Sequence, residues 1–198
     1  TPETVARRAR IVTEAMASGG VLPVLKHLPG HGRATADSHL ALPVVDASLD
    51  ELRATDFAAF APLADLAMGM TAHIVYSALD PDAPATQSPA GIRAIREEIG
   101  FDGLLMTDDL SMNALEGSMA ERAERSIAAG CHLVLHCNGD MAEMEGALSA
   151  TPRLHGRAAA RADRALAARR APEPFDPAEA DARFAEIAKA LNGERAHA

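Results

Sequence analysis

The sequence predicts an α/β protein built on a parallel sheet. Short apolar segments alternate with helical segments along most of the chain, and this alternation is typical of βαβ units. Residues with reactive side chains come directly after the apolar segments, where the strands of a parallel sheet end at one common edge. Four such groups are present: Lys26-His27, His73, Asp108-Asp109 and His136–Asn138.

The first expected elements are a helix and a strand. Thr1 is placed to cap a helix that has Pro2 in its first turn and reaches about Ser18, before a pair of glycines. The apolar run Val21–Leu25 then predicts a buried strand. In the loop that follows, prolines and glycines exclude a regular helix.

The middle of the chain predicts two helices around a second strand. Ser48, with a glutamate three residues later, forms a capping-box pattern that opens the first helix. The run 66–76, LAMGMTAHIVY, predicts the strand. Gly91–Gly100 predicts the second helix, with the last glycine as its cap.

The remaining segments predict two more strands and a helical tail. Gly103–Thr107 is the third strand and His132–His136 the fourth, with a helix over Met119–Ala129 between them. After Met141 the chain is rich in alanine, arginine and glutamate, and we expect it to be helical except for a break at Ala171–Pro177. We treat residues 1–198 as one domain and 141–198 as its C-terminal helical segment.

Four strands leave two architectures open. A (β/α)₈ barrel and a doubly wound sheet both place their active sites at the carboxyl ends of the strands. A complete barrel has eight strands and typically about 250 residues, whereas this chain has 198 residues and four expected strands. The sheet is therefore expected to be either small and open or one half of a barrel.

The composition argues against two classes of partner, nucleic acids and membranes. The chain has a formal net charge of −9, only 3% aromatic residues and no tryptophan. A negative chain with few aromatic side chains is not expected to bind nucleic acid or an anionic membrane. No apolar run approaches the roughly 20 residues that span a bilayer.

The two cysteines indicate the cellular compartment. Cys131 and Cys137 lie six positions apart in one apolar run. An extended chain holds residues at that spacing roughly 20 Å apart, too far for a disulfide. Because reduced thiols are typical of the cell interior, we expect a cytoplasmic protein.

Residues 26–39, KHLPGHGRATADSH, concentrate reactive side chains in one segment. A polar surface loop is the simplest interpretation, but a lysine and a histidine at a strand end favour a site. Asp37 and His39 are spaced to form a carboxylate–histidine dyad, in which the carboxylate fixes the imidazole tautomer and raises its pKa. Such a histidine exchanges protons near neutral pH. An Asx turn made by Asp37 alone is the alternative.

A metal site is a further interpretation of the same segment. His27 and His31 have the four-residue spacing of helical zinc ligands. Pro29-Gly30 lies between them and interrupts that helix, and the accompanying glutamate is absent. Asp37 and His39 remain candidate ligands, although we expect no metal.

Residues 104–112, LLMTDDLSM, carry two adjacent carboxylates at the end of an apolar strand. Such carboxylates are costly to bury unless they are hydrogen-bonded or functional. Either Asp108 or Asp109 is placed to cap the next helix while the other reaches into a site. An aspartate nucleophile with a separate acid/base is the chemistry of retaining glycosidases.

Together these motifs resemble a known family. KHLPGHG and ADSH, followed by MTAHIVY, PATQSP and FDGLLMTDDLSM, look like the bacterial family-3 β-N-acetylglucosaminidases of peptidoglycan recycling. The likeness is dense over residues 1–140 and loose in the alanine-rich tail. KHxPGHG with DSH eleven residues after the lysine is highly specific, whereas TDD alone is weak.

The resemblance implies roles for individual residues. Asp108 matches the nucleophile, His39 the acid/base and Asp37 its dyad partner. Lys26 and His27 match residues that hydrogen-bond the sugar hydroxyls. Residues 30–42 correspond to a mobile loop that carries the dyad. His73, Asp109 and Met112 are implied to lie near the pocket as further substrate contacts.

The resemblance also implies a mechanism and an architecture. The reaction is a double displacement with retained configuration, without metal or cofactor. The substrate is a small muropeptide-type glycoside, N-acetylglucosaminyl-1,6-anhydro-N-acetylmuramic acid with or without its peptide. The chain matches the C-terminal half of a (β/α)₈ barrel, so the N-terminal half, which carries an Asp and an Arg that bind the sugar, is the implied partner.

Two other functional classes stay open. One is a non-catalytic α/β domain that kept the motifs by descent, and the other is a sugar-binding module. The chain also departs from the family at His132, where an acidic residue is common, and we assign no function to that difference.

Overall fold

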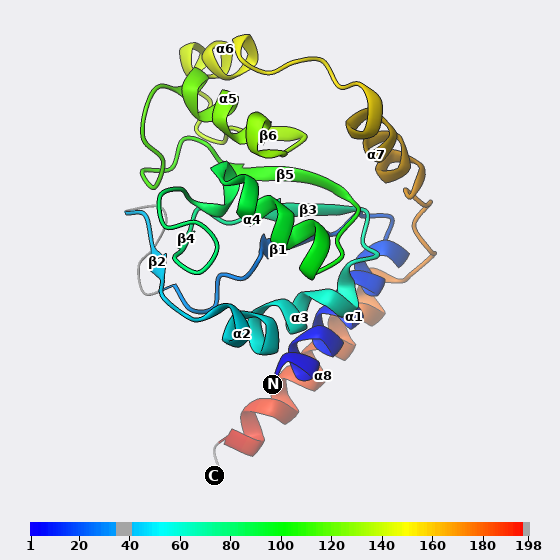
Figure 1. The fold of residues 1–198 in the computed structure, drawn as a ribbon. Coiled ribbons are helices and arrows are strands. Elements are labelled where there is room, and N and C mark those ends of the chain that lie inside the picture. The colour runs from blue at the N-terminus through cyan, green and yellow to red at the C-terminus, as the bar shows by residue number, and fades with distance from the viewer. Residues whose placement is uncertain (35–40, 196–198) are drawn as a thin grey trace.

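A four-stranded parallel sheet forms the centre of the molecule (Figure 1). The structure is a computed structural model that describes residues 1–34 and 41–195. The strand order is β1-β3-β5-β6, with every neighbouring pair parallel. The strands are β1 (Val24–Leu28), β3 (Met68–Thr71), β5 (Leu104–Asp109) and β6 (Leu133–Leu135). The predicted α/β class with a parallel sheet is confirmed.

The first and third strands run further toward their carboxyl ends than the sequence predicts. The prediction of Val21–Leu25 for the first strand was wrong, because Pro23 has no N–H to donate and the ladder begins only at Val24. Lys26 and His27 therefore lie on β1 itself. The third predicted strand, Gly103–Thr107, is β5, and it continues through Asp109, which pairs with Leu135 of β6.

The run 66–76 was predicted as one strand and is two. The chain leaves the main sheet after Thr71, and β4 (Val75–Tyr76) pairs instead with β2 (Val44–Val45) in a small parallel sheet. The change follows from the backbone partners: Ile74 accepts from the Ala85 amide, and the Val75 amide donates to Pro43. Hydrophobic patterning does not encode such partners.

The predicted helices form, with irregular interiors in two of them. Glycines in the left-handed region end two helical stretches, Gly100 with φ +81° and Gly130 with φ +121°. Thr1 caps α1 (Pro2–Ser18). The Ser48 capping box opens α2 (Leu49–Glu51), which is continued by a π-type turn (Leu52–Phe57), α3 (Ala58–Phe60) and a 3₁₀ turn (Ala61–Leu63). A short 3₁₀ turn (Ala85–Gln87) precedes α4 (Pro89–Arg93), which is continued by a π-type turn (Ala94–Glu98), and α5 (Met119–Ala129) forms as predicted.

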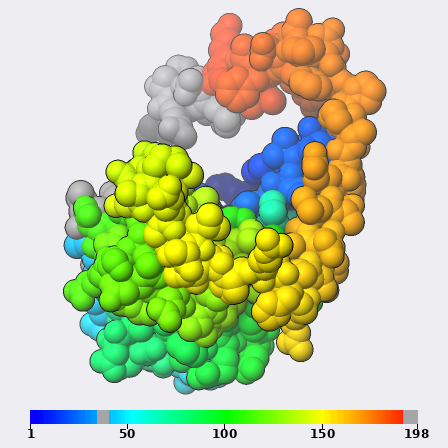
Figure 2. Space-filling model, turned by 90° about the horizontal axis from the view of Figure 1, so that it is seen from above, coloured from blue at the N-terminus to red at the C-terminus, as the bar shows by residue number. Residues whose placement is uncertain are grey.

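The C-terminal tail is helical in three pieces. They are α6 (Met141–Ser149), α7 (Gly156–Ala167) and α8 (Pro177–Arg195). The predicted break before α8 is present, and a second one separates α6 from α7. Figure 2 shows the orange-to-red segment from α7 into α8 projecting from the body of the molecule. Phe184 of α8 is 73% exposed, so this helix contributes little to the core.

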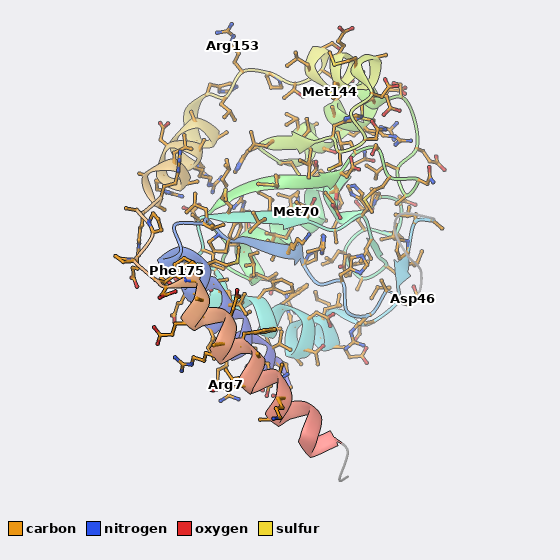
Figure 3. All side chains as sticks on the ribbon, turned by 180° about the vertical axis from the view of Figure 1, so that it is seen from behind. Arg7, Asp46, Met70, Met144, Arg153 and Phe175 are labelled. Atoms are coloured by element: carbon orange, nitrogen blue, oxygen red, sulfur yellow. The ribbon has the colours of Figure 1, made fainter. Side chains whose placement is uncertain are left out.

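Apolar side chains pack the sheet against its helices. Leu28, Ile95, Phe101 and Leu105 are all fully buried in one cluster, and Figure 3 shows Met70 in the middle of the sheet. A second, smaller cluster lies between α5, α6 and the residues after β5: Leu110, Leu115, Met119, Ala123 and Ala147. Cys131 is buried, Cys137 is exposed and neither is in a disulfide. Among the described helices, none combines the length and apolarity needed to cross a membrane.

Two arginines enclose His132 at the amino end of β6. Arg161 Nη1 lies 3.1 Å and Arg96 Nη2 3.4 Å from His132 Nε2, while His132 Nδ1 accepts from the Leu105 amide at 3.1 Å. Burial and the two positive charges lower the pKa of His132 to about 4. Burial and the neighbouring Arg161 lower the pKa of Arg96 to about 10. Asp102 accepts from Arg161 and so supplies the negative charge in the group.

The contacts of Gly69 predict a large stability loss on adding one methyl group. In Gly69→Ala, the new Cβ would lie 2.8 Å from both Leu28 Cδ1 and Phe101 Cζ. Overpacking of this kind costs about 1–3 kcal/mol, so urea titration should show a lower midpoint. Gly32→Ala is the matched control, because nothing lies within 4 Å of its added Cβ. Equal midpoints for the two variants would contradict the packing described.

The environment of His132 predicts a pH-dependent stability. Its pKa in the folded chain, about 4, lies below the ordinary value near 6.5, so between these limits the unfolded chain binds a proton that the folded chain excludes. The free energy of unfolding should therefore fall as pH is lowered through this window. His132→Asn should flatten the fall measured between pH 7 and 4.5. If His132→Asn keeps the same dependence of the free energy of unfolding on pH, His132 does not contribute to that dependence.

Candidate active site

His27 and Asp108 meet at the carboxyl edge of the sheet. They come from β1 and β5, on either side of β3, and His27 Nε2 lies 3.3 Å from Asp108 Oδ2. Their side chains are 25% and 15% exposed. Burial lowers the pKa of His27 by more than the Asp108 carboxylate raises it. The imidazole is therefore neutral at pH 7, and its Nε2 faces the Asp108 carboxylate.

A cavity of about 470 Å³ opens beside this pair. Lys26 and His27 line it from β1, Pro2 and Val5 from α1, and Asp56 from the helical stretch after α2. The volume lies in the range of sites for small ligands. The predicted binding residues Lys26 and His27 therefore share one concave surface at the strand ends.

The two adjacent aspartates have different surroundings. Asp109 accepts three hydrogen bonds: Oδ1 from the Ser111 amide at 3.0 Å and the Cys137 amide at 3.1 Å, and Oδ2 from the Ser111 hydroxyl at 2.6 Å. Burial raises the pKa of Asp109, but these hydrogen bonds outweigh it and leave the pKa below its ordinary value. Among donors from the described residues, Asp108 accepts only the Asp109 amide, on Oδ1 at 2.9 Å, and it also faces His27.

Neither aspartate caps the following helix. Ser118 caps α5 through a capping box with Glu121, nine residues after Asp109. The capping alternative for this pair was therefore wrong, because the chain turns at Ser111 before α5 begins. Asp109 holds that turn, and Asp108 is the carboxylate of the two that faces His27.

His73 and Met112 lie inside the protein. His73 is fully buried, with Nδ1 2.8 Å from Thr86 Oγ1 and Nε2 3.0 Å from the Asp109 carbonyl oxygen. Met112 is 5% exposed, and its carbonyl accepts from Arg122. Both are close to the Asp108–Asp109 turn, and their side chains are covered by protein.

The predicted dyad, Asp37 and His39, lies outside the described residues. The chain leading to it is anchored beside the cavity: Tyr76 donates its hydroxyl to the Gly30 carbonyl, and Arg33 Nε donates to Asp56 at 2.7 Å. The described chain resumes before β2, which pairs with β4. Both described flanks are therefore fixed near β4 and the cavity.

The metal interpretation receives no support from the described ranges. Within residues 1–34 and 41–195, no three side chains of His, Cys, Asp or Glu are grouped to hold a metal ion. His27 and His31 stack edge to face, with ring centroids 5.5 Å apart. The candidate ligands Asp37 and His39 are not covered by this observation.

Comparison with known proteins gives the family. The model of the glycosyl hydrolase family 3 N-terminal domain matches residues 1–167. The chain belongs to glycoside hydrolase family 3. A β-hexosaminidase of Neisseria gonorrhoeae is 44% identical over 142 residues, covering 69% of this family-3 chain and 39% of the relative.

Solved structures agree with this assignment. A family-3 β-N-acetylglucosaminidase from Paenibacillus sp. str. FPU-7 superposes with a TM-score of 0.74 at 30% identity, covering 88% of this chain and 37% of that one. NagZ from Neisseria gonorrhoeae, in complex with N-trifluoroacetyl-D-glucosamine, superposes with a TM-score of 0.71 at 39% identity, covering 82% of this chain and 47% of that one. The chain thus spans less than half the length of each of these relatives.

Sequence reasoning missed Thr86, Ser111 and Glu143, which support the site of this family-3 chain, although it named His136 among the residues at the strand ends. Thr86 and Ser111 bond His73 and Asp109, respectively. His136 Nε2 lies 2.8 Å from Glu143 Oε2, while its buried Nδ1 has no hydrogen-bond partner among the described residues. For Ser111 a signal existed, because a serine two positions after an aspartate is typical of an Asx turn. The pairing of His136 with Glu143 depends on where α6 packs and has no local signal.

The contrast between the aspartates predicts that the same amide substitution lowers stability at Asp109 but not at Asp108. Asp109→Asn replaces an acceptor by a donor that faces other donors, and should lower the free energy of unfolding by about 1–2 kcal/mol. Asp108→Asn disturbs one backbone hydrogen bond and should leave stability nearly unchanged. Thermal melts of both variants at pH 7 measure this, with an expected fall in Tm of about 2–8 °C for Asp109→Asn alone. A larger fall in Tm for Asp108→Asn than for Asp109→Asn would mean that Asp108, not Asp109, is the aspartate that stabilises the fold.

Proposed function

We propose that this protein is a retaining exo-β-N-acetylglucosaminidase with Asp108 as its nucleophile. The observation that carries the proposal is the different hydrogen bonding of the two aspartates at the end of β5. Asp109 is fully engaged by Ser111 and Cys137, whereas Asp108 Oδ2 accepts no hydrogen bond among the described residues and lies 3.3 Å from Nε2 of His27, which lines the cavity. A carboxylate nucleophile needs an accessible oxygen that is not held by strong donors. The names of the family-3 relatives support the same activity.

The proposed reaction has two displacements. Asp108 attacks the anomeric carbon as the glycosidic bond breaks, and His39 protonates the departing oxygen, which gives a covalent glycosyl-enzyme. His39, oriented by Asp37, then takes a proton from water as the water displaces Asp108 and releases N-acetylglucosamine. These two roles rest on the motif resemblance. The mechanism uses no metal or organic cofactor.

Lys26 and His27 are proposed to bind the sugar hydroxyls. Both line the cavity, and Lys26 is an exposed cation on β1. His27 Nε2 also lies 3.3 Å from Asp108 Oδ2. The same residue is therefore proposed to contact both the sugar and the nucleophile.

The proposed architecture is the C-terminal half of a (β/α)₈ barrel. β1 and β6 are the two edges of the four-stranded sheet, and four further strands between them would close it. The proposed partner is an N-terminal half that completes the sugar site. The proposed substrate is N-acetylglucosaminyl-1,6-anhydro-N-acetylmuramic acid, with or without its peptide, in the cytoplasm.

Covalent trapping tests the proposal. A slow fluorinated N-acetylglucosaminyl donor should add one sugar to the protein, and peptide mapping should find it on Asp108. Asp108→Asn should lose turnover of 4-nitrophenyl N-acetyl-β-glucosaminide by about 10⁴-fold or more, the scale expected for loss of a covalent nucleophile. Asp50→Asn, at a side chain that is 95% exposed, is the matched control and should keep full activity.

The same experiment separates the enzyme from a sugar-binding module. A module would bind N-acetylglucosamine equally well before and after Asp108→Asn, and it would not acquire the adduct. An adduct on Asp109 or on another residue would refute the assignment of the nucleophile while leaving the retaining mechanism intact.

A further inference from the structure

We propose that His73 is a positioning residue for Asp108 and acts through the main chain of Asp109. The inference rests on the proposed function, because it concerns the orientation of the proposed nucleophile. His73 does not contact the cavity: it is fully buried, and both of its ring nitrogens have partners inside the protein. A contact with substrate would require at least one of them to be free.

The surroundings of His73 fix its protonation state. Nε2 lies 3.0 Å from the Asp109 carbonyl oxygen, and since a carbonyl only accepts, Nε2 carries a proton. Complete burial disfavours the charged ring and lowers the pKa of His73. The ring is therefore neutral, and Nδ1 is left as an acceptor.

Two buried threonines complete the chain of hydrogen bonds. Thr86 Oγ1 lies 2.8 Å from His73 Nδ1 and 3.0 Å from the Ala72 carbonyl oxygen. Since neither Nδ1 of this tautomer nor a carbonyl can donate, the one hydroxyl proton of Thr86 is shared between these two acceptors. Thr71 Oγ1 lies 2.8 Å from Thr86 Oγ1 and completes the group. All three side chains are 0% exposed, so the threonines hold the His73 ring in the position from which Nε2 reaches the Asp109 carbonyl.

Asp109 transmits this constraint to the nucleophile. Its amide donates to Asp108 Oδ1 at 2.9 Å, and its carboxylate accepts from Ser111 and Cys137. The His73 bond acts on the Asp109 carbonyl, which also accepts from the Met112 amide at 3.2 Å. This carbonyl belongs to the peptide after Asp109, so the bond restrains the backbone on the far side of the Asp109 Cα from the amide that binds Oδ1. Without the His73 donor, the carbonyl keeps only the longer bond from Met112, and the Asp109 backbone is held less firmly.

Paired substitutions at His73 test the proposal by kinetics. His73→Leu removes the donor, while the side-chain amide of His73→Gln supplies one near the position of Nε2. We expect kcat on 4-nitrophenyl N-acetyl-β-glucosaminide to fall about 10²-fold in His73→Leu, the scale expected for misplacement of a reacting group. KM should stay within about threefold, because no sugar contact is lost, and His73→Gln should recover most of kcat. Unchanged kcat in His73→Leu, or equal losses in both variants, would overturn the proposal.

Thr86 provides a second pair of variants if His73→Leu fails to fold. Thr86→Val removes the hydroxyl that bonds Nδ1, so the ring loses the partner that fixes its rotation toward Asp109. We expect a loss of kcat in Thr86→Val and its recovery in Thr86→Ser, which keeps the hydroxyl. Thr86→Val with the kcat of the unsubstituted protein would contradict a role for the hydrogen-bond chain.

An NMR measurement tests the same chain without turnover. Long-range ¹H–¹⁵N spectra of the unsubstituted protein at pH 7 should show His73 as the neutral tautomer with its proton on Nε2. An imidazolium, or a proton on Nδ1, would overturn the proposal. If the protein turns over no N-acetylglucosaminide while His73 shows the expected tautomer, the proposed function fails and the hydrogen-bond chain stands.

Discussion

The hydrogen bonding of Asp109 is the interaction on which the candidate site depends. A carboxylate at the end of a half-buried strand is stable only if donors replace the water it loses. Asp109 obtains these donors from Ser111 and from Cys137, which follows β6. Because its amide and carbonyl bind Asp108 and His73, the same residue also joins the ends of β5 and β6 to the segment after β3.

This arrangement leaves Asp108 available for chemistry. Ser111 and Cys137 donate to Asp109, so Asp108 keeps one oxygen toward His27, which lines the cavity. The neutral state of His27 follows from burial. The two adjacent carboxylates thus have different environments: Asp109 is held by hydrogen bonds, and Asp108 is left for chemistry. Sites that use paired carboxylates in different roles depend on such a difference.

The opposite end of the sheet shows how burial affects charged groups that do not serve the site. Arg96 and Arg161 converge on His132, which has no negative charge to offer them. The consequence is a depressed pKa for both Arg96 and His132. The acidic residue that the resemblance leads one to expect at this position would pair with these arginines, so the difference at His132 affects stability at the end of the sheet away from the candidate site.

The sequence by itself determined the α/β class, the bounds of α5 and the clustering of Lys26, His27 and Asp108 at one edge. Local signals carry these features: capping boxes, glycine caps and apolar runs that end in reactive residues. It could not determine that β4 leaves the main sheet, that Asp109 binds Ser111 and Cys137, or that His73 is buried against Thr86 and Asp109. These features were decided by tertiary structure, because a hydrogen-bond partner far away in sequence is specified by packing and leaves no periodic trace in the chain.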